Sequence, residues 1–483
     1  MVGAGPDYHS PVPSPYRPVT DGVLSRLREV LLDEEVLRDE EQRQAYARDE
    51  TEDLRFLPEV VVTPSSTAEV QEVLRIAHEE RVPVTPRGAG TGLSGGALPT
   101  RGGIVLSCER LNTIREVDER DMVAEAEVGV VTDDLRRAVA ERGLFYPPDP
   151  SSSDVCTLGG NLAEDAAGPR SLRYGSTRHH VLGLEAVLAD GSLLRTGGRN
   201  RKDVAGYDLT QLLVGSEGTL AVITAAVLRL QPAPGETLSL LAPFDSLDAA
   251  AAAVEAVCRV TPRLLACELV EREAVETVAR VTPVPDELRG AEAILFLELA
   301  SEDEGALFEA ASALEAVLRE RGSGEVKAAR QAADQRRLWE VRRRVGAAVK
   351  GRSVYKECDA TVPRSRLAEL VRAARETAAH HDLLALCYGH AGDGNLHVNL
   401  LRGDLDDETW SDRMAAAEEE LFERVLAVGG TVTGEHGIGL TQRRFLERTR
   451  GPRAVEIMRG LKGVFDPRGI LNPDKVLPDE VAR

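Results

Sequence analysis

The sequence predicts an α+β protein made of two large domains. A chain of 483 residues is too long for one ordinary domain and is long enough to build two or three cores. Up to about residue 230, short strands alternate with glycine-rich turns and a few helices. The segment QPAPGE then resembles a linker, and alanine-rich amphipathic helices alternate with apolar strands beyond it. We therefore expect an extended, proline-containing arm at 1–19, a first domain at 20–232 and a second at 233–477.

Several elements follow from local patterns. The stretch TPSSTAEVQEVLRIAHEERVPVTP predicts a helix capped by Thr67 and followed by a strand. The stretch LEAVLADGSLLRTG predicts a hairpin that turns on Asp190 and Gly191. In the second domain we expect helices at 247–258, 304–321 and 365–380 and a strand at 294–300.

The charge and composition exclude several classes of partner. The net charge is −21 and the pI is about 5.0, which disfavours binding to nucleic acid or to an anionic membrane. An anionic substrate would therefore need a local basic pocket. The chain has neither an apolar signal segment near its start nor an apolar run of about 18 residues, as a transmembrane helix requires. We expect a cytoplasmic protein whose membrane association, if any, is made through a partner.

The six cysteines show no CxxC spacing. In a chain of this size they predict reduced and mostly buried thiols rather than a disulfide framework. They lie at positions 108, 156, 258, 267, 358 and 387.

The segment PRGAGTGLSGG at 86–96 offers many backbone N–H groups, which suit phosphate binding. A Rossmann turn is excluded because these glycines lead into the strand IVLS and do not open a helix. A P-loop is excluded because Gly-Lys-Ser/Thr is absent, and a plain surface loop stays open as an alternative. Similar small-residue segments follow at 147–175 and 202–224. Together the three segments predict one large, phosphate-bearing ligand wrapped by backbone.

The glycine-rich segment GHAGDGNLH contains His390 and His397, and a turn within it would bring the two histidines to one point. The segment TVTGEHGIG adds Glu435. Two imidazoles and a carboxylate suit Zn²⁺ or another first-row divalent ion with an open position for substrate. The spacing is not a standard zinc signature, so ordinary surface or core histidines stay an alternative.

A basic segment, LWEVRRRVGAAVKGRSVYKECD, lies at 338–359. In an acidic chain, a guanidinium and an ammonium that converge on one site would capture a carboxylate. The alternative is a solvated helix face.

Taken together, these motifs resemble a known family. The segments PRGAGTGLSGG, GGNLAEDAAG, RYG and GSEGTLAVIT are similar to the FAD-binding domain of the vanillyl-alcohol oxidase/p-cresol methylhydroxylase (PCMH) superfamily. GHAGDGNLH and GEHGIG resemble its 2-hydroxy-acid branch, which includes the glycolate oxidase flavin subunit, D-lactate dehydrogenase and D-2-hydroxyglutarate dehydrogenase. The resemblance covers roughly residues 20–477. It implies a PCMH-type FAD-binding domain of two α/β subdomains and a C-terminal substrate domain with an antiparallel sheet and helices.

The resemblance also implies noncovalent FAD, because no histidine lies between 79 and 178 to carry a covalent link. Two departures from the family affect local backbone geometry: NLAEDAAG replaces the usual NVAENAGG, and Ala221 replaces a glycine. The residues implied to bind FAD are Pro86, Arg87, Gly88, Ala89, Gly90, Thr91, Gly92, Pro150, Gly159, Gly160, Asn161, Ala163, Asp165, Gly168, Glu217, Gly218, Ile223 and Asn472.

The same resemblance implies a reaction, the FAD-dependent oxidation of a D-2-hydroxy acid to the 2-oxo acid. The substrate would be D-lactate, glycolate or D-2-hydroxyglutarate, with metal-assisted deprotonation and hydride transfer to flavin N5. The metal, Zn with Mn or Fe as alternatives, would be held by His390, His397 and Glu435. The implied catalytic residues are His436 as base, Arg342 and Lys356 as substrate contacts, and Asn395 or Asn399 as a polar contact.

Three alternatives remain open from the sequence. One is a non-redox flavoenzyme of the alkyl-dihydroxyacetone-phosphate synthase type. Another is a zinc hydrolase or metal-binding module with a structural glycine loop. The third is the flavin subunit of a glycolate oxidase complex. Since the chain has no cysteine cluster for an iron–sulfur centre, electrons would pass to a quinone, an electron-transfer flavoprotein or an iron–sulfur partner subunit. The sequence leaves the oligomeric state open, with a homodimer as one alternative.

Overall fold

The computed structural model describes residues 15–285 and 288–479, which form two compact units. The first unit contains the chain up to Ala167, Ser176–Ala233 and the segment from Glu435 onward; the second contains Gly168–Gly175 and Pro234–Gly434. The main crossing at residue 233 coincides with the expected linker. As a compact unit, the second part ends at Gly434, because the last segment packs in the core of the first unit through Ile470 and Leu471. The expected domain boundary at 477 stays a prediction. Most of the expected arm at 1–19 lies outside the described residues.

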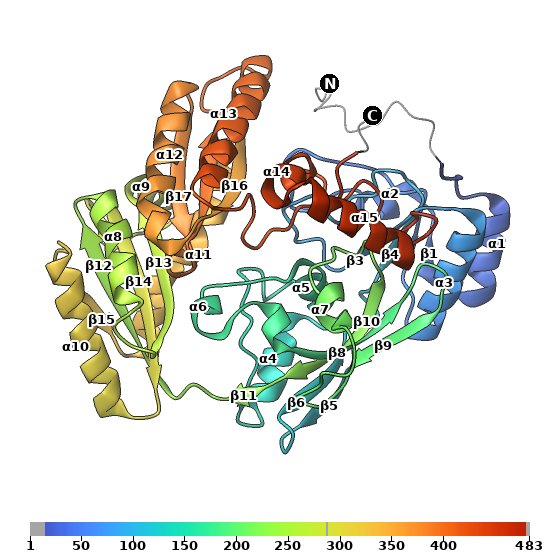
Figure 1. The fold of residues 1–483 in the computed structure, drawn as a ribbon, viewed down its shortest axis with the longest axis horizontal. Helices are drawn as coiled ribbons and strands as arrows, with labels where there is room; N and C mark the ends of the chain where they lie inside the picture. Colours follow the sequence, from blue (N-terminus) through green and yellow to red (C-terminus); the bar gives the residue numbers. More distant parts are fainter. Residues whose placement is uncertain (1–14, 286–287, 480–483) are drawn as a thin grey trace. The chain divides into compact units, whose positions relative to one another are not determined.

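The first unit contains a four-stranded sheet in the order β1-β2-β4-β3 (Figure 1). Its strands are β1 (Val36–Leu37), β2 (Val60–Val62), β4 (Ile104–Ser107) and β3 (Val84–Arg87). β2, β4 and β3 are parallel, and β2 and β4 are entirely buried, as their continuous apolar sequences require. The helices α1 (Asp21–Val30), α2 (Glu40–Gln44) and α3 (Thr67–Glu80) belong to this part. The cap of α3 is Ser66, one residue before the expected Thr67, because Ser66 and Glu69 form a reciprocal capping box.

A second, five-stranded antiparallel sheet has the order β5-β6-β10-β8-β9. Its strands are β5 (Ile114–Asp118), β6 (Val123–Glu127), β10 (Val222–Arg229), β8 (Val181–Val187) and β9 (Leu193–Gly197). The hairpin expected on Asp190 and Gly191 is confirmed, and Gly191 adopts a φ of 83° in its turn. The remaining elements are α4 (Thr132–Ala140), β7 (Leu144–Phe145), α5 (Leu158–Glu164), α7 (Leu209–Leu213), β11 (Gln231–Pro232), α14 (Leu446–Arg450) and α15 (Pro452–Phe465).

The second unit is built on a seven-stranded antiparallel sheet in the order β15-β12-β14-β13-β17-β18-β16. Its strands are β15 (Lys327–Ala329), β12 (Glu236–Phe244), β14 (Ala293–Ser301), β13 (Leu264–Glu271), β17 (Leu384–Gly389), β18 (Asn395–Leu401) and β16 (Tyr355–Thr361). Its helices are α6 (Ser171–Tyr174), α8 (Leu247–Val257), α9 (Arg272–Ala279), α10 (Glu304–Glu320), α11 (Ala332–Arg352), α12 (Leu367–His380) and α13 (Asp407–Ala427). The helices and the strand expected here are confirmed to within two residues at each end.

The helices of this unit pack on the sheet in two groups. α9 and α11 share one hydrophobic cluster with sheet residues such as Phe296 and Tyr388. α12 packs against β17 and α13, and α13 packs against β16. Helices therefore pack against the antiparallel sheet of the second unit.

The turn between β17 and β18 brings the two predicted histidines together. After His390, a single 3-10 turn, η5 (Ala391–Asp393), is closed by the N–H of Gly394, which donates to the carbonyl of Ala391 at 3.0 Å. Gly394 has a φ of 78°, and a Cβ built on it would lie 2.2 Å from the carbonyl oxygen of Val362. Both the left-handed backbone and the close approach require glycine at this position.

We predict that Gly394→Ala destabilises the second unit far more than Gly403→Ala. Gly403 also has a positive φ, 58°, but nothing lies near its Cβ position. Strain alone should cost about 1–2 kcal/mol at Gly403, whereas Gly394 adds a backbone collision and should cost roughly 2–4 kcal/mol. Urea unfolding of both variants measures this difference. Equal losses would show that the approach of Val362 does not constrain the turn.

Candidate functional site

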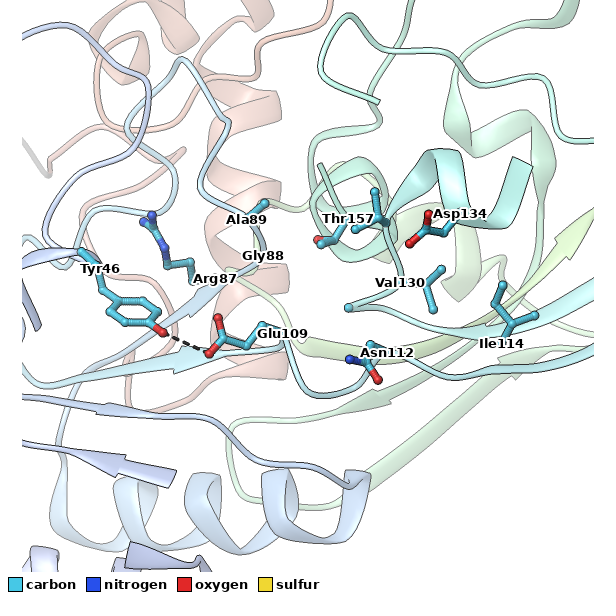
Figure 2. Close-up of a pocket in the computed structure, with 13 residues that line it drawn as sticks. Tyr46, Arg87, Gly88, Ala89, Glu109, Asn112, Ile114, Val130, Asp134 and Thr157 are labelled. Carbon is cyan, nitrogen blue, oxygen red and sulfur yellow. Dashed lines mark hydrogen bonds between the residues drawn. The ribbon is translucent and has the colours of Figure 1, made fainter. Parts of the chain in front are cut away.

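A pocket of about 780 Å³ opens in the first unit beside the predicted phosphate-binding loop. Figure 2 shows Arg87, Gly88 and Ala89 of that loop at its wall, together with residues from more distant segments. A volume of this size lies within the range of cofactor sites. The full lining consists of Ala45, Tyr46, Arg87, Gly88, Ala89, Glu109, Asn112, Ile114, Gly129, Val130, Val131, Asp134 and Thr157.

The first two predicted FAD-binding segments meet at this pocket. A Cβ built on Gly88 would lie 2.6 Å from Oγ1 of Thr157 and 3.4 Å from the amide nitrogen of Gly160. A Cβ built on Gly159 would lie 2.9 Å from the Cβ of Val128. Glycine therefore allows the two backbone segments to approach each other where a larger residue would keep them apart.

Two polar atoms at the pocket lack a hydrogen-bond partner among the described residues. Arg87 and Thr157 are both buried, yet Nη1 of Arg87 and Oγ1 of Thr157 have no hydrogen-bond partner among the described residues. Burial lowers the pKa of Arg87, whose guanidinium lies 5.7 Å from the ring centroid of Tyr46. Tyr46 donates to Glu109 at 3.0 Å (Figure 2). Buried donors without partners indicate that a ligand supplies the acceptors, and the phosphate-bearing cofactor FAD suits this set.

The third predicted segment is tied to the first through Asn472. Its amide Nδ2 donates to the carbonyl of Gly96 at 2.9 Å and to the carbonyl of Glu217 at 2.7 Å. Gly218 has a φ of 66°, and its Cβ position lies 3.1 Å from Cγ of Pro86. These contacts within the first unit therefore join four of the residues predicted to bind FAD: Pro86, Glu217, Gly218 and Asn472.

One of the two departures from the family has a structural explanation. Asp165 ends α5 in the left-handed conformation, with a φ of 56°, which aspartate and asparagine tolerate better than other residues. Its carboxylate accepts from the backbone N–H of Arg178 at 2.8 Å and also pairs with the Arg178 guanidinium. Aspartate here thus keeps the turn that the family builds with asparagine.

Other predicted FAD residues have structural partners. Asn161 is buried and donates to Oγ1 of Thr132 at 2.6 Å. The carbonyls of Gly92 and Ala163 accept from the N–H groups of Glu50 and Glu217. The FAD contacts of all the predicted residues stay predictions. Those not described above are Ala89, Gly90, Thr91, Pro150, Gly160, Ile223 and Gly168, the last of which belongs to the second unit.

Glu217 also holds the GEHGIG segment. Its carboxylate accepts from the N–H of Ile438 at 2.8 Å and from that of Gly439 at 2.7 Å. A Cβ built on Gly437 would lie 2.3 Å from Oε2 of Glu164, so only glycine passes between the two carboxylates. Next to this segment, Nε2 of His436 lies 3.9 Å from Oε1 of Glu435.

The two buried carboxyls share this space as a titrating pair. Burial, reinforced by Glu217, raises the pKa of Glu164 well above its usual value. Burial raises the pKa of Glu217 to about 7, although the two amide donors lower it. The arrangement therefore favours a bound proton on the pair near neutral pH.

In the second unit, a buried carboxylate orients the first predicted metal ligand. Oε1 of Glu268 lies 2.8 Å from Nδ1 of His390, and Nε of Arg342 donates to Oε2 of Glu268 at 2.8 Å. Burial by itself raises the pKa of Glu268, but His390 and Arg342 outweigh burial and lower the pKa to about 2. An ionised Glu268 requires His390 to donate from Nδ1, which leaves the lone pair of Nε2 for a metal ion.

His397 lies beside His390 and completes the imidazole pair. The ring centroids of His390 and His397 are 5.4 Å apart, and both side chains are buried. Nδ1 of His397 lies 3.7 Å from Glu357 and 3.9 Å from Asp359, both on β16. Two buried imidazoles with adjacent carboxylates form a donor set that suits Zn²⁺ or another first-row divalent ion.

Asp359 anchors the stretch that leads to Glu435. Its Oδ1 accepts from Nδ2 of Asn395 at 2.7 Å, and its Oδ2 accepts from Oγ1 of Thr433 at 2.8 Å and from the N–H of Gly434 at 2.7 Å. Glu435 is the next residue, and it begins the last segment of the first unit. Its place as the third metal ligand stays a prediction, as does the role of His436.

The side-chain amide of Asn395 is used in hydrogen bonds within the second unit, whereas that of Asn399 is not. Besides Asp359, Nδ2 of Asn395 donates to the carbonyl of Ala360 and to Oγ1 of Thr361. Asn399 shares its face of β18 and is fully buried, yet neither its Oδ1 nor its Nδ2 has a hydrogen-bond partner among the described residues. Of the two asparagines expected to offer a polar contact, Asn399 is thus the better placed.

The strand register argues against the substrate contact expected of Lys356. Lys356 pairs with Leu400, whereas Asp359 pairs with His397. Paired residues share a face and successive residues alternate, so Lys356 lies on the face of the sheet opposite His397. There its ammonium lies 3.8 Å from a carboxylate oxygen of Glu418 in α13. The motif VYK located the strand, but its phase turns the lysine away from the histidines.

Several residues of these sites were missed in the sequence. Glu268 and Asp359 lie in strands beside the histidines, and Tyr46 and Glu109 lie at the pocket of the first unit. For Glu268 a signal exists, because an acid in the fully buried strand LLACELVE needs a charged partner. The others carry no local pattern that points to a site.

We predict that Glu164→Gln weakens the pH dependence of stability. The folded protein retains a proton on the Glu164–Glu217 pair between pH 4.5, the ordinary pKa of a glutamate, and about pH 7, whereas the unfolded chain releases it. The free energy of unfolding should therefore fall as pH rises through this window, and the variant should lose roughly 1–3 kcal/mol less than wild type between pH 5 and 8. Urea unfolding at several pH values, with the exposed Glu141→Gln as control, measures the difference. Identical slopes in all three proteins would contradict the pairing.

Comparison with known proteins shows the family to which the chain belongs. The chain matches the family of the C-terminal domain of FAD linked oxidases over residues 233–476 and the FAD binding domain over residues 58–197. It is 40% identical to glycolate oxidase subunit GlcD of Bacillus subtilis (strain 168), over 91% of this chain and 93% of the relative. It is 41% identical to a D-lactate dehydrogenase of Archaeoglobus fulgidus, over 86% of this chain and 91% of the relative.

A solved structure confirms the fold class. The crystal structure of p-cresol methylhydroxylase with substrate bound superimposes with a TM-score of 0.79, at 19% identity, over 95% of this chain and 97% of that chain. The expected PCMH-type FAD-binding domain with a C-terminal domain is confirmed. No helix in the described residues is long and apolar enough to cross a membrane. Because of the two family matches and the identity to its relatives, the chain belongs to the FAD-linked oxidases and is an FAD-dependent oxidoreductase.

Proposed function

We propose that this protein oxidises a small 2-hydroxy acid, either D-lactate or the achiral glycolate, to the corresponding 2-oxo acid. The observation that carries the proposal is the buried cluster in which Glu268 orients His390 and holds Arg342 beside it. Relatives named glycolate oxidase subunit and D-lactate dehydrogenase support this substrate class. A cationic side chain next to a metal-competent imidazole pair suits a substrate with a carboxylate and a neighbouring hydroxyl.

The side chains divide the work by their chemistry. When bound, FAD supplies the hydride acceptor, and a divalent ion held by His390, His397 and Glu435 lowers the pKa of the substrate hydroxyl. Arg342 binds the substrate carboxylate and thereby sets the orientation of the Cα–H bond. A ring nitrogen of His436 takes the hydroxyl proton as general base.

The surroundings of Arg342 favour a small acid. Its guanidinium carbon lies 5.0 Å from the ring centroid of Tyr388, whose hydroxyl donates to Glu357 at 3.1 Å. A Cβ built on Gly346, one helical turn after Arg342, would lie 3.3 Å from the Tyr388 hydroxyl oxygen. Tyr388 therefore lies against this side of the cluster, and we propose that its ring leaves less space there for a second carboxylate on the substrate.

The electrons must leave the protein through a separate acceptor. Among the described residues, none of the side-chain groups able to hold a metal ion contains a cysteine. We therefore propose a quinone, an electron-transfer flavoprotein or an iron–sulfur partner subunit as acceptor.

We predict that Arg342→Lys raises the KM for D-lactate at least tenfold. Lysine keeps the positive charge but loses the planar, bidentate geometry that holds both Glu268 and a substrate carboxylate. Steady-state kinetics with an artificial electron acceptor measures the change. Arg343→Lys, at the neighbouring exposed position, is the control and should keep the wild-type KM. An unchanged KM in Arg342→Lys would remove Arg342 from substrate binding.

We predict that His436→Ala keeps bound FAD and loses turnover. Removing a general base typically costs a factor of about 10² to 10⁴ in rate. The visible spectrum reports the cofactor, and anaerobic stopped-flow mixing with D-lactate reports the rate of flavin reduction. Reduction at the wild-type rate would overturn the assignment of the base.

A further inference from the structure

A second group of side chains able to hold a metal ion lies on α12 and α13, where His380 and His381 precede β17 and His390 follows its other end. His380 is the last residue of α12, His381 follows it, and Glu420 lies in α13. Nδ1 of His380 is 2.8 Å from Oε2 of Glu420, and Nε2 of His381 is 3.0 Å from the same oxygen. The two imidazole ring centroids are 4.8 Å apart. Two adjacent histidines therefore direct nitrogen atoms at one carboxylate oxygen.

The distances are close to those of a metal-bound set. The three ligand atoms lie within 4.8 Å of one another. Ligands of a tetrahedral Zn²⁺ ion, with bonds of about 2.0–2.2 Å, lie about 3.3 Å apart. The separations of 2.8 and 3.0 Å need to open by only a few tenths of an ångström, which side-chain rotation readily supplies. We propose that His380, His381 and Glu420 form a surface site for Zn²⁺ or another divalent ion that prefers imidazole ligands.

The neighbours of Glu420 leave the relevant oxygen available. Oγ1 of Thr377 donates to Oε1 of Glu420 at 3.1 Å, and Arg424 lies 3.8 Å from that same oxygen. Both engage Oε1, so Oε2 is the oxygen that faces the two imidazoles.

The exposure of the cluster gives it a different character from the buried histidine pair. The His380 side chain is 71% exposed, and those of His381 and Glu420 are 18% and 28% exposed. Water can therefore complete the coordination and the ion can exchange with solvent. Because two of the three ligands are imidazoles, the site selects Zn²⁺, Cu²⁺ or Ni²⁺ over Mg²⁺ and Ca²⁺, which prefer oxygen ligands.

A bound ion would join α12 to α13. Two residues before Glu420, Glu418 lies 3.8 Å from Lys356 on β16, the strand that also carries Asp359. An ion at this cluster would therefore restrain the helix that packs on β16. The role that follows is a structural clamp on this edge of the sheet, which does not depend on the oxidation chemistry.

Zinc titration of the full-length, FAD-loaded protein tests the site. Isothermal titration calorimetry should give one fewer Zn²⁺ per chain for the double variant His380→Ala/His381→Ala than for wild type. Glu420→Gln keeps the size of the side chain and removes its charge, and it should weaken this site at least tenfold. The control His179→Ala removes one exposed histidine beside Ser176 and should keep the wild-type number of ions.

Hydrogen exchange provides a second readout, which is local to the end of α12 and to Glu420. In wild type and His179→Ala, added Zn²⁺ should slow amide exchange at the end of α12 and around Glu420, whereas added Mg²⁺ should not. In the double variant and at matched Zn²⁺ this protection should be lost. An equal number of bound Zn²⁺ ions and equal protection in wild type and the double variant would overturn the proposal.

Discussion

The buried carboxylate of Glu268 is the interaction on which the candidate site of the second unit depends. It lies on β13 and pairs with Arg342 of α11 and with His390 at the end of β17, so one side chain joins three elements. An unpaired buried charge costs several kcal/mol, and each partner is therefore held in place by the other two. The same pairing commits Nδ1 of His390 to Glu268 and leaves Nε2 for a metal ion. The Glu268 carboxylate therefore both stabilises this buried cluster and orients the imidazole of His390.

The first unit solves a different problem, which is to present backbone to a large ligand. Gly88 allows one loop to approach the start of α5, and Asn472 ties that loop to the segment around Glu217. Arg87 supplies a buried cation in a chain whose net charge is −21. The carboxylate of Glu217 holds the GEHGIG segment. Its pairing with the carboxyl of Glu164 makes the stability of the first unit sensitive to pH.

Local patterns in the sequence were enough to predict the linker near 233, the hairpin on Gly191 and the histidine turn. Partnerships between distant residues were not predictable in this way. Glu268 lies 74 residues from Arg342 and 122 from His390, and no local pattern records such pairs. The orientation of Lys356 depends on strand phase, in which a single residue reverses the face. The return of the last segment to the first unit depends on the packing of Leu471, which only the folded chain reveals.

The most direct test of the account is the visible spectrum of the purified protein before and after anaerobic addition of D-lactate, glycolate and D-2-hydroxyglutarate in turn. The account predicts a flavin spectrum that bleaches with D-lactate or glycolate. Because the Tyr388 ring lies against Arg342, the larger acid D-2-hydroxyglutarate should bleach it more slowly. A flavin spectrum that none of the three acids changes would contradict the proposed hydroxy-acid oxidation and leave the flavoprotein fold intact.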